Sequence, residues 1–275
     1  MSKKKLYYIT TEIAPFATVS SLSKFSARVP LFLQEKGHDI RTIIPKYGYV
    51  SERKYILREV IRLRDISFEF DGLEHSTSAK SAFIPKTRVQ VYFLEDDKWF
   101  LPLTNLLYKA KNGRILSDNG ERYAYYSKAV LSTLPHLFWV PDVFICNNWQ
   151  SALVPGMYNK HFRGISDFYK NIKSLLLIHD NDNYAEISRK DLNKAEVPIH
   201  KSLKGDVLNV YDVASYEVDS IIILDTSSNL ISKDLMELQG IKANKNKVSI
   251  INIENDEKPN FYKISEDIDK IILKL

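Results

Sequence analysis

Polar side chains that could bind or transform a small molecule follow several short apolar runs of this sequence. They are Glu12, the acidic group Glu95–Asp97, the amide-rich group Asn147–Gln150, and His179. A carboxylate or an imidazole can transfer protons or hold a metal ion. Asn and Gln can hydrogen-bond a hydroxyl group, but neither can act as a general base. The sequence therefore places both kinds of chemistry at the ends of its apolar runs.

The elements that position Glu12 form a strand, a loop and a helix. Residues 6–10 are a short apolar run that predicts a buried parallel strand. From Leu22 the apolar residues recur at helical spacing, and Gly37 ends the predicted helix. Residues 40–44 predict a second strand. Open α/β sheets bind ligands at the carboxyl ends of such strands, so the loop between Thr10 and Leu22 is a candidate binding loop.

Four stretches carry a resemblance to a known family. They read TEIAPFATVSSL (residues 11–22), VPLFLQEKGHDIR (29–41), DNGERYAYYSKA (118–129) and PDVFICNNWQSALVP (141–155). These are similar to SEVAPFAKxGGL, LPxALxxxGHDVR, DNxxRFAFFSxA and PDVVHAHDWHTGLVP in the amino-terminal catalytic lobe of bacterial glycogen and starch synthases. That family contains glycosyltransferases of the GT-B type, family five. The resemblance covers about residues 5–232.

The resemblance and the pattern of elements predict one fold. We expect an α/β, Rossmann-like domain with a mostly parallel sheet and helices on both faces. Residues 66–70 alternate and precede Asp71–Gly72, which predicts a β-hairpin insertion. We expect residues 1–275 to form a single GT-B lobe, with 233–275 as a closing strand and helix and no second lobe.

Further helices are predicted in the second half of the chain. Residues 190–195 and 203–218 have helical patterns. Thr226–Asn229 is expected to cap another helix that continues to Gly240.

The resemblance also implies site residues. His179 matches a histidine that approaches the transferred sugar, so it is the candidate catalytic residue. Glu12, Leu22, Trp149 and His179 are the candidate substrate-binding residues. The resemblance implies no metal site and no cofactor.

The residues that contact the donor differ from the family pattern. Thr18 stands where the family has a lysine, and Ser20 and Ser21 stand where it has two glycines. A Cβ atom at either serine would obstruct the approach of a phosphate group if its φ angle were positive. Asn148 and Gln150 replace charged family residues and keep only hydrogen-bonding capacity.

Several of these polar groups have alternative interpretations. Glu95–Asp97 could bind a metal or form a solvated turn, and Asp180–Asn183 could bind a metal or form a loop. Tyr123 and Tyr126 could form a platform for a sugar or belong to the core. His179 could be functional or simply a hydrogen-bonded histidine at a strand end.

Composition excludes several classes of protein. The chain has 275 residues, with 39 basic and 34 acidic side chains and a net charge of +5, which does not require a nucleic-acid partner. Its one cysteine permits no internal disulfide and is typical of a reducing compartment. No apolar run approaches the length of a membrane span. We expect a soluble cytoplasmic protein.

The resemblance implies transfer of glucose from ADP-glucose or UDP-glucose to an α-1,4-glucan. Because the donor-binding residues differ, we expect that activity to be weak or absent in this chain alone, and whether the chain is an enzyme stays open. The alternative is a non-catalytic glucan-binding or regulatory subunit, with a protein partner at the open face of the cleft.

Overall fold

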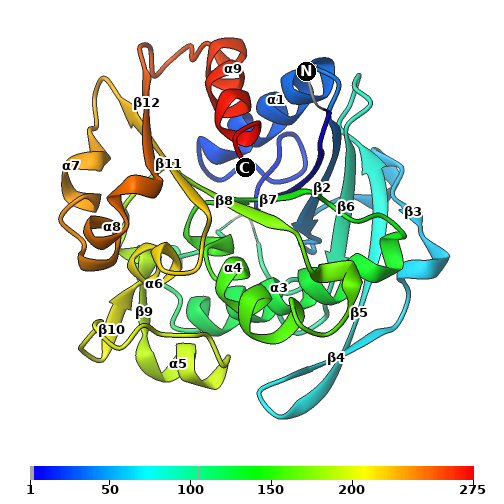
Figure 1. Cartoon of the computed structure of the whole chain (residues 1–275). Helices are drawn as coiled ribbons and strands as arrows, with labels where there is room; N and C mark the ends of the chain where they lie inside the picture. Colours follow the sequence, from blue (N-terminus) through cyan, green and yellow to red (C-terminus); the bar gives the residue numbers. More distant parts are fainter. Residues whose placement is uncertain (1–2, 105) are drawn as a thin grey trace.

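The computed structural model describes residues 3–104 and 106–275, and its centre is one large mixed sheet. The strand order is β12-β11-β8-β7-β1-β2-β6-β5-β3, with β4 paired to β5 (Figure 1). The parallel strands are β1 (Lys5–Ile9), β2 (Asp39–Pro45), β6 (Gln90–Glu95), β7 (Val143–Asn147), β8 (Lys173–Ile178), β11 (Ser220–Thr226) and β12 (Val248–Ile253). The antiparallel strands are β3 (Arg58–Glu59), β4 (Ile66–Phe70) and β5 (Leu73–Phe83).

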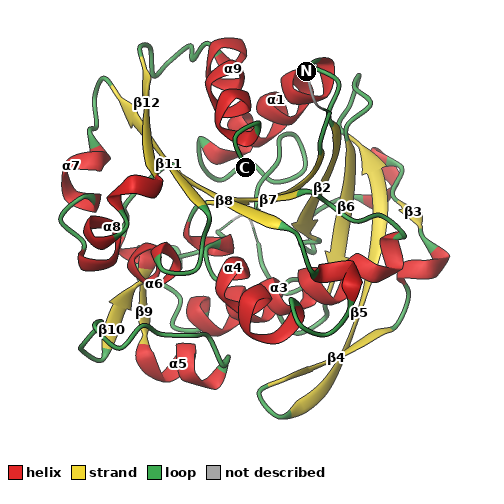
Figure 2. Ribbon diagram, in the orientation of Figure 1, coloured by secondary structure: helices red, strands yellow, loops and turns green. Residues whose placement is uncertain are grey.

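Helices cover both faces of the sheet (Figure 2). One face carries α1 (Leu22–Glu35) and α9 (Phe261–Ile272). The other carries α3 (Asn119–Thr133), α4 (Val154–Met157) and α6 (Val210–Ser215). The remaining α-helices of the described residues are α2 (Glu52–Tyr55), α5 (Arg189–Lys194), α7 (Ile231–Leu235) and α8 (Gln239–Ala243). The predicted α/β architecture is therefore confirmed.

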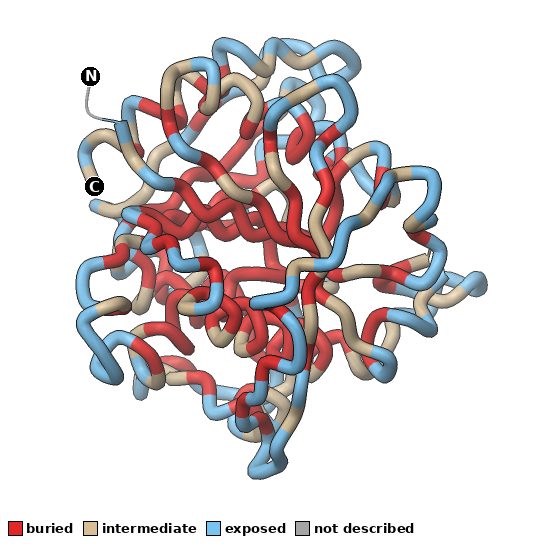
Figure 3. The backbone as a smooth tube through the Cα atoms, turned by 90° about the vertical axis from the view of Figure 1, so that its right-hand side faces the viewer, coloured by how far each residue is buried: buried red, intermediate tan, exposed pale blue. Residues whose placement is uncertain are grey.

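Strands β1, β2, β7, β8 and β11 supply side chains to two cores because successive residues point to opposite faces. In β1, Leu6 and Tyr8 pack on the face of α1 and α9, whereas Tyr7 and Ile9 pack on the face of α3. All four side chains are fully buried. The strands at the centre are buried along most of their length, and the exposed residues lie at the periphery (Figure 3).

The predicted hairpin insertion is confirmed. Phe70 pairs with Leu73, so Asp71 and Gly72 form the two-residue loop between β4 and β5. Both loop residues have positive φ angles, 55° and 69°. A type I′ turn requires this conformation, which Gly and Asp adopt more readily than most residues.

The prediction of a helix over residues 203–218 is wrong in its first half. Residues 207–209 form β10 (Val207–Asn209), which pairs with β9 (Glu186–Ser188). Gly205, with φ of +100°, prevents helical continuation. The side chain of Asn209 accepts a hydrogen bond from the Tyr211 N–H group, and α6 begins there.

The helix predicted to continue to Gly240 is also interrupted. It forms two short helices, α7 and α8, because Leu238 has an extended backbone with ψ of 135°. The Asp212 carboxylate accepts a hydrogen bond from the Gly240 N–H group and so holds the start of α8 against α6.

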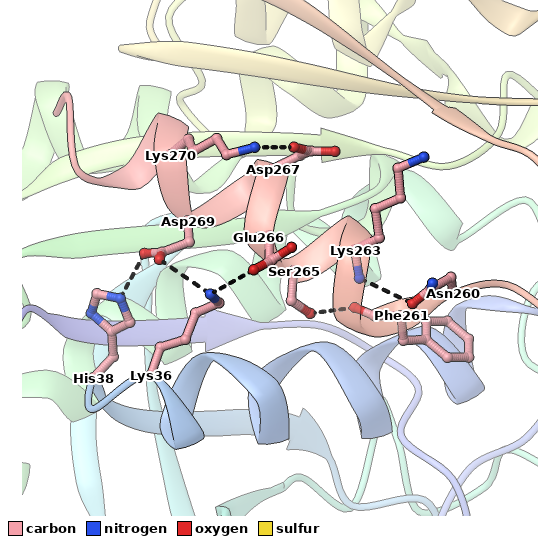
Figure 4. A network of polar contacts seen from close by, with 10 residues as sticks. All are labelled: Lys36, His38, Asn260, Phe261, Lys263, Ser265, Glu266, Asp267, Asp269 and Lys270. Atoms are coloured by element: carbon pink, nitrogen blue, oxygen red, sulfur yellow. Dashed lines mark hydrogen bonds and ion pairs between the residues drawn. The ribbon is translucent and has the colours of Figure 1, made fainter.

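Helix α9 is fixed on α1 by apolar and polar contacts. Its apolar face packs in one buried cluster with α1, and the members of that cluster include Ile264, Ile268, Ile272, Phe25, Val29 and Leu33. Just beyond the end of α1, His38 Nε2 lies 2.8 Å from Asp269 Oδ1, and both side chains are buried (Figure 4). His38 Nδ1 accepts a hydrogen bond from the Lys4 N–H group at 3.1 Å, so His38 Nε2 is the donor to Asp269.

Replacement of Asp269 is the first testable consequence. We expect Asp269→Ala to lower the free energy of unfolding by about 2 kcal/mol, because a buried imidazole N–H group loses its acceptor. Urea denaturation measures this change. Asp267→Ala is the matched control, because Asp267 pairs with the exposed Lys270 and should change stability by less than about 0.5 kcal/mol. Equal effects of the two variants would contradict a structural role for the His38–Asp269 pair.

None of the helices in the described part of the chain is long and apolar enough to cross a membrane.

Candidate functional site

The loop between β1 and α1 folds back on the Glu12 carboxylate. Oε2 of Glu12 accepts hydrogen bonds from the N–H groups of Val19, at 2.8 Å, and Ser20, at 2.7 Å. Oε1 accepts from Ser20 Oγ at 2.9 Å and from the Tyr108 hydroxyl at 2.8 Å. Glu12 is fully buried, and both of its oxygens already have two donors. In this conformation Glu12 holds the loop in place.

The other residues of the loop lie as follows. Leu22 is the first residue of α1 and is buried in the core. Thr18, Ser20 and Ser21 are exposed. Ser21 has φ of −60°, and Ser20 does not belong to the described residues with positive φ. The predicted steric obstruction by a Cβ atom at these serines therefore does not apply.

His179 directly follows β8 and is a neutral histidine. Its ring packs edge-on against Phe25, with centroids 4.3 Å apart. Its Nε2 lies 3.4 Å from the side-chain oxygen of Asn147. Burial lowers the pKa of His179 from 6.5 to about 3. Near neutral pH the imidazole can therefore make hydrogen bonds but carries no charge.

A cavity of about 180 Å³, called here the aromatic pocket, lies beside this loop. Its lining residues are Val19, Ser20, Leu106, Leu107, Tyr108, Lys109, Trp149, Gln150, Asp180, Asp182 and Tyr184. The rings of Trp149 and Tyr184 are stacked, with centroids 6.0 Å apart and an interplanar angle of 26°. Trp149 is only 1% exposed, whereas Tyr184 is partly exposed and offers its ring to the pocket.

Two oxygens at the aromatic pocket have no hydrogen-bond partner among the described residues. They are Gln150 Oε1 and Asp180 Oδ1, and both atoms are buried. The other Asp180 oxygen accepts a hydrogen bond from the Asn148 amide. Buried polar atoms are rarely left unpaired, so these two oxygens mark a place at the pocket where hydrogen-bond donors are missing.

Asp180 has a perturbed pKa. Burial is the main cause that raises its pKa from 3.8 to about 6, and the nearby Asp182 also contributes. Because the pKa of Asp180 is higher in the folded chain than in the unfolded chain, the protonated carboxyl group stabilises the fold fully below pH 3.8. This stabilisation is lost as the pH rises through about 6, the pKa in the folded chain.

A pH series can test this environment. As the pH rises from 4 to 7, we expect the natural chain to lose about 1 to 2 kcal/mol of stability that Asp180→Asn keeps, because Asn does not ionise. Urea unfolding at each pH measures the difference. Parallel stability curves over this range would contradict the proposed burial of the carboxyl group.

The remaining polar groups have structural roles. The Tyr126 hydroxyl donates to the backbone oxygens of Thr10, at 2.8 Å, and Ile43, at 2.9 Å, so this tyrosine belongs to the core. Tyr123 is also buried. The Asp96 carboxylate accepts from the Trp99 N–H group at 2.7 Å, as in a tight turn. Within the described ranges, no three His, Cys, Asp or Glu side chains converge in a metal-binding group.

Sequence reasoning missed Tyr108 and Tyr184. Tyr108 lies in the long loop before α3, and Tyr184 lies in a turn after β8. Neither residue belongs to a periodic pattern that would predict its position. Trp149 and His179 were predicted, but only Trp149 lines the aromatic pocket. His179 lines a larger cavity on the other side of Val19 and Ser20.

Comparison with known proteins shows the family of this chain. The family model of the starch synthase catalytic domain matches residues 5–258. The chain belongs to this family. The glycogen synthase of Chlorobium limicola is 29% identical over 235 residues, which are 84% of this chain and 47% of that protein. The glycogen synthase of Chlorobium luteolum is 34% identical over 176 residues, which are 64% of this chain and 36% of that protein.

The family match confirms the predicted resemblance and extends it from about residue 232 to residue 258, through α7, α8 and β12. The chain spans less than half the length of these two glycogen synthases. A solved structure, the catalytic domain of starch synthase IV from Arabidopsis thaliana bound to ADP and acarbose, has a TM-score of 0.76 at 20% identity. The matched part is 91% of this chain and 52% of the starch synthase IV chain. This similarity confirms a GT-B type of fold for this starch synthase-family chain.

Proposed function

We propose that this glycosyltransferase lobe binds an α-1,4-glucan in the aromatic pocket. We further propose that alone it transfers glucose from ADP-glucose or UDP-glucose weakly or not at all. The observation that carries this proposal is the contrast between the two sides of the binding loop. The pocket has a partly exposed aromatic ring and two unpaired acceptor oxygens, whereas the uncharged Thr18 stands at the position of the family's donor-binding lysine.

The aromatic pocket has the chemistry of a sugar subsite. The ring of Tyr184 can pack against the apolar face of a glucose unit. Glucose hydroxyl groups can donate to the free oxygens of Gln150 and Asp180. The Arabidopsis starch synthase IV domain was solved with acarbose and ADP bound, which supports a glucan and a sugar nucleotide as ligand classes for this family.

The donor side lacks the lysine that the family pattern has at the position of Thr18. A departing diphosphate needs cations or N–H groups, and loss of one such group typically costs about 10²–10³ in rate. Thr18 carries no charge, and Glu12 already accepts the N–H groups of Val19 and Ser20. Neutral His179 adds no charge either.

Calorimetric titration with ADP-glucose and UDP-glucose tests the donor side. We expect no binding to the natural chain and measurable binding to a Thr18→Lys, Ser20→Gly, Ser21→Gly variant, because a lysine restores the cation. The matched control is Thr18→Gln, Ser20→Gly, Ser21→Gly, which has the same glycines without the charge and should not bind. Tight donor binding by the natural chain would refute the proposal.

We also propose a cytoplasmic location. Cys146 is the one cysteine, and it is buried in β7. Burial raises the pKa of its thiol, so it stays protonated and unreactive. Detection of the chain with an antibody in the separated fractions of disrupted cells measures its location.

A further inference from the structure

The strand at one end of the large sheet, β12, has a free outer edge (Figure 1). Its six residues pair in parallel with β11, and within residues 3–104 and 106–275 no other strand pairs with them. An edge strand presents a row of unpaired backbone N–H and C=O groups on its outer side. The outer edge of β12 is therefore open to hydrogen bonds from another strand.

The other free edges of the large sheet are protected against such pairing. β3 consists of only two residues, Arg58 and Glu59, and both are charged and exposed. β4 carries the exposed Glu69. Short strands and charged side chains are the usual features that keep a sheet edge from pairing. The sequence of β12, VSIINI, contains no charged residue, proline or glycine, and its Ile250 is 47% exposed. Of these edges, that of β12 is the one suited to pair with a further strand.

The charges that flank β12 have opposite signs at its two ends. Residues 240–247, which precede the strand, contain three lysines and no carboxylate. Residues 254–257, which follow it, contain three carboxylates and no cation. A second β12 that runs antiparallel brings each basic end beside an acidic end, whereas a parallel one brings like charges together. A two-fold dimer requires a surface that is complementary to itself in this way. The partner that fits this edge is therefore a second copy of the chain.

Lys245 and Glu257 are the flanking charges best placed to act between two copies. Both side chains are exposed, and neither takes part in an ion pair among the described residues. Other flanking charges have partners within the chain. Lys247 Nζ donates to a backbone oxygen of α6 at 3.1 Å, and Glu254 Oε1 lies 2.6 Å from Lys263 Nζ.

We propose that two copies of this chain pair antiparallel through the outer edges of β12, which joins their two sheets into one. Successive residues of a strand point to opposite faces, so a two-fold axis at the centre of the pair places one residue opposite its own counterpart. With Ile250 at the axis, the two exposed isoleucine side chains pack on each other, and Lys245 lies opposite the acidic segment 254–257 of the other copy. This inference goes beyond the proposed function and does not depend on it.

Sedimentation velocity of the full chain at concentrations from about 1 μM to about 1 mM tests the proposal. We expect a monomer–dimer equilibrium that shifts to monomer on dilution, because six paired residues make a small interface. Ile250→Lys should weaken the association about tenfold or more, since two like charges would face each other at the axis. Ile61→Lys is the matched control. Ile61 is 83% exposed, directly after the segment of β3 at the opposite side of the sheet, and its replacement should leave the association unchanged.

Charge reversal tests the antiparallel direction. Lys245→Glu should weaken the dimer about threefold or more, because it places carboxylates at both ends of the paired strands. Lys245→Glu/Glu257→Lys should restore the affinity, because the two signs are exchanged. Loss of affinity that the second replacement does not reverse would contradict the antiparallel arrangement.

Cysteine cross-linking tests the register. Facing residues of an antiparallel pair have Cα atoms about 4.5–5.5 Å apart, and a disulfide requires about 4.4–6.8 Å. With an added oxidant, Ile250→Cys should therefore form a disulfide between two copies, and Ile61→Cys should not. The natural Cys146 is buried and does not interfere.

Two results would overturn the proposal. The first is a natural chain that stays monomeric over the whole concentration range, including the case in which the edge of β12 binds a different protein. The second is a dimer that Ile250→Lys does not weaken, because such a dimer uses another surface. Thermal unfolding of each variant shows that a loss of association is not a loss of folding.

Discussion

Glu12→Gln is expected to lower the free energy of unfolding by about 3 kcal/mol, because two backbone N–H groups lose a charged acceptor. The Glu12 carboxylate accepts from four donors that belong to Val19, Ser20 and Tyr108. A glutamine offers these N–H groups only a neutral acceptor oxygen, and its NH₂ group takes the place of the charged oxygen that accepts from the hydroxyls of Ser20 and Tyr108. Urea denaturation measures the change.

Ser20→Ala is the matched control for this prediction. It removes the Ser20 hydroxyl, which donates to Glu12 at 2.9 Å and accepts from the Leu22 N–H group at 3.3 Å, and it leaves the N–H groups of Val19 and Ser20 paired with Glu12. We expect a loss of about 1 to 2 kcal/mol, the usual contribution of two hydrogen bonds. If Glu12→Gln proved no more destabilising than Ser20→Ala, the Glu12 carboxylate would not be the element that holds this loop.

Tyr184→Ala is expected to weaken the binding of maltoheptaose about tenfold or more, because truncation of a central aromatic contact typically costs 2 kcal/mol or more. Tyr184 is the partly exposed ring of the aromatic pocket, stacked on the buried Trp149. Calorimetric titration measures the affinity, and thermal unfolding of the variant confirms that it is folded.

Tyr262→Ala is the matched control for Tyr184→Ala. Tyr262 is 52% exposed on α9, outside the lining of the aromatic pocket. Its removal should leave maltoheptaose affinity unchanged. A similar loss in both variants, or none in Tyr184→Ala, would show that the glucan binds elsewhere.

Much of the fold could be predicted because the relevant signals are local. The apolar run at residues 6–10 and the helical spacing after Leu22 each specify an element, and Gly37, with φ of +96°, ends α1 as expected. The Asp71–Gly72 pair specifies the hairpin in the same way. The prediction failed at residues 203–209, where pairing with β9 overrides a helical pattern.

The site was harder to predict because it depends on contacts between distant residues. Tyr108 reaches Glu12 across 96 positions of the sequence, and no local pattern encodes that hydrogen bond. The position of Tyr184 over Trp149 likewise depends on the turn after β8. The prediction of obstruction at Ser20 and Ser21 assumed positive φ angles, which a sequence with serine at both positions does not require.

Sedimentation with glycogen in the presence of labelled ADP-glucose tests the central claim most directly, since one sample reports both binding and transfer. We predict that the chain sediments with glycogen and that the glycogen gains no label above a sample without protein. The Tyr184→Ala variant should stay in the supernatant. Incorporation of label at ordinary enzyme rates, about 1–10³ s⁻¹, would contradict the claim of weak or absent transfer. Failure of the natural chain to sediment would contradict the claim of glucan binding.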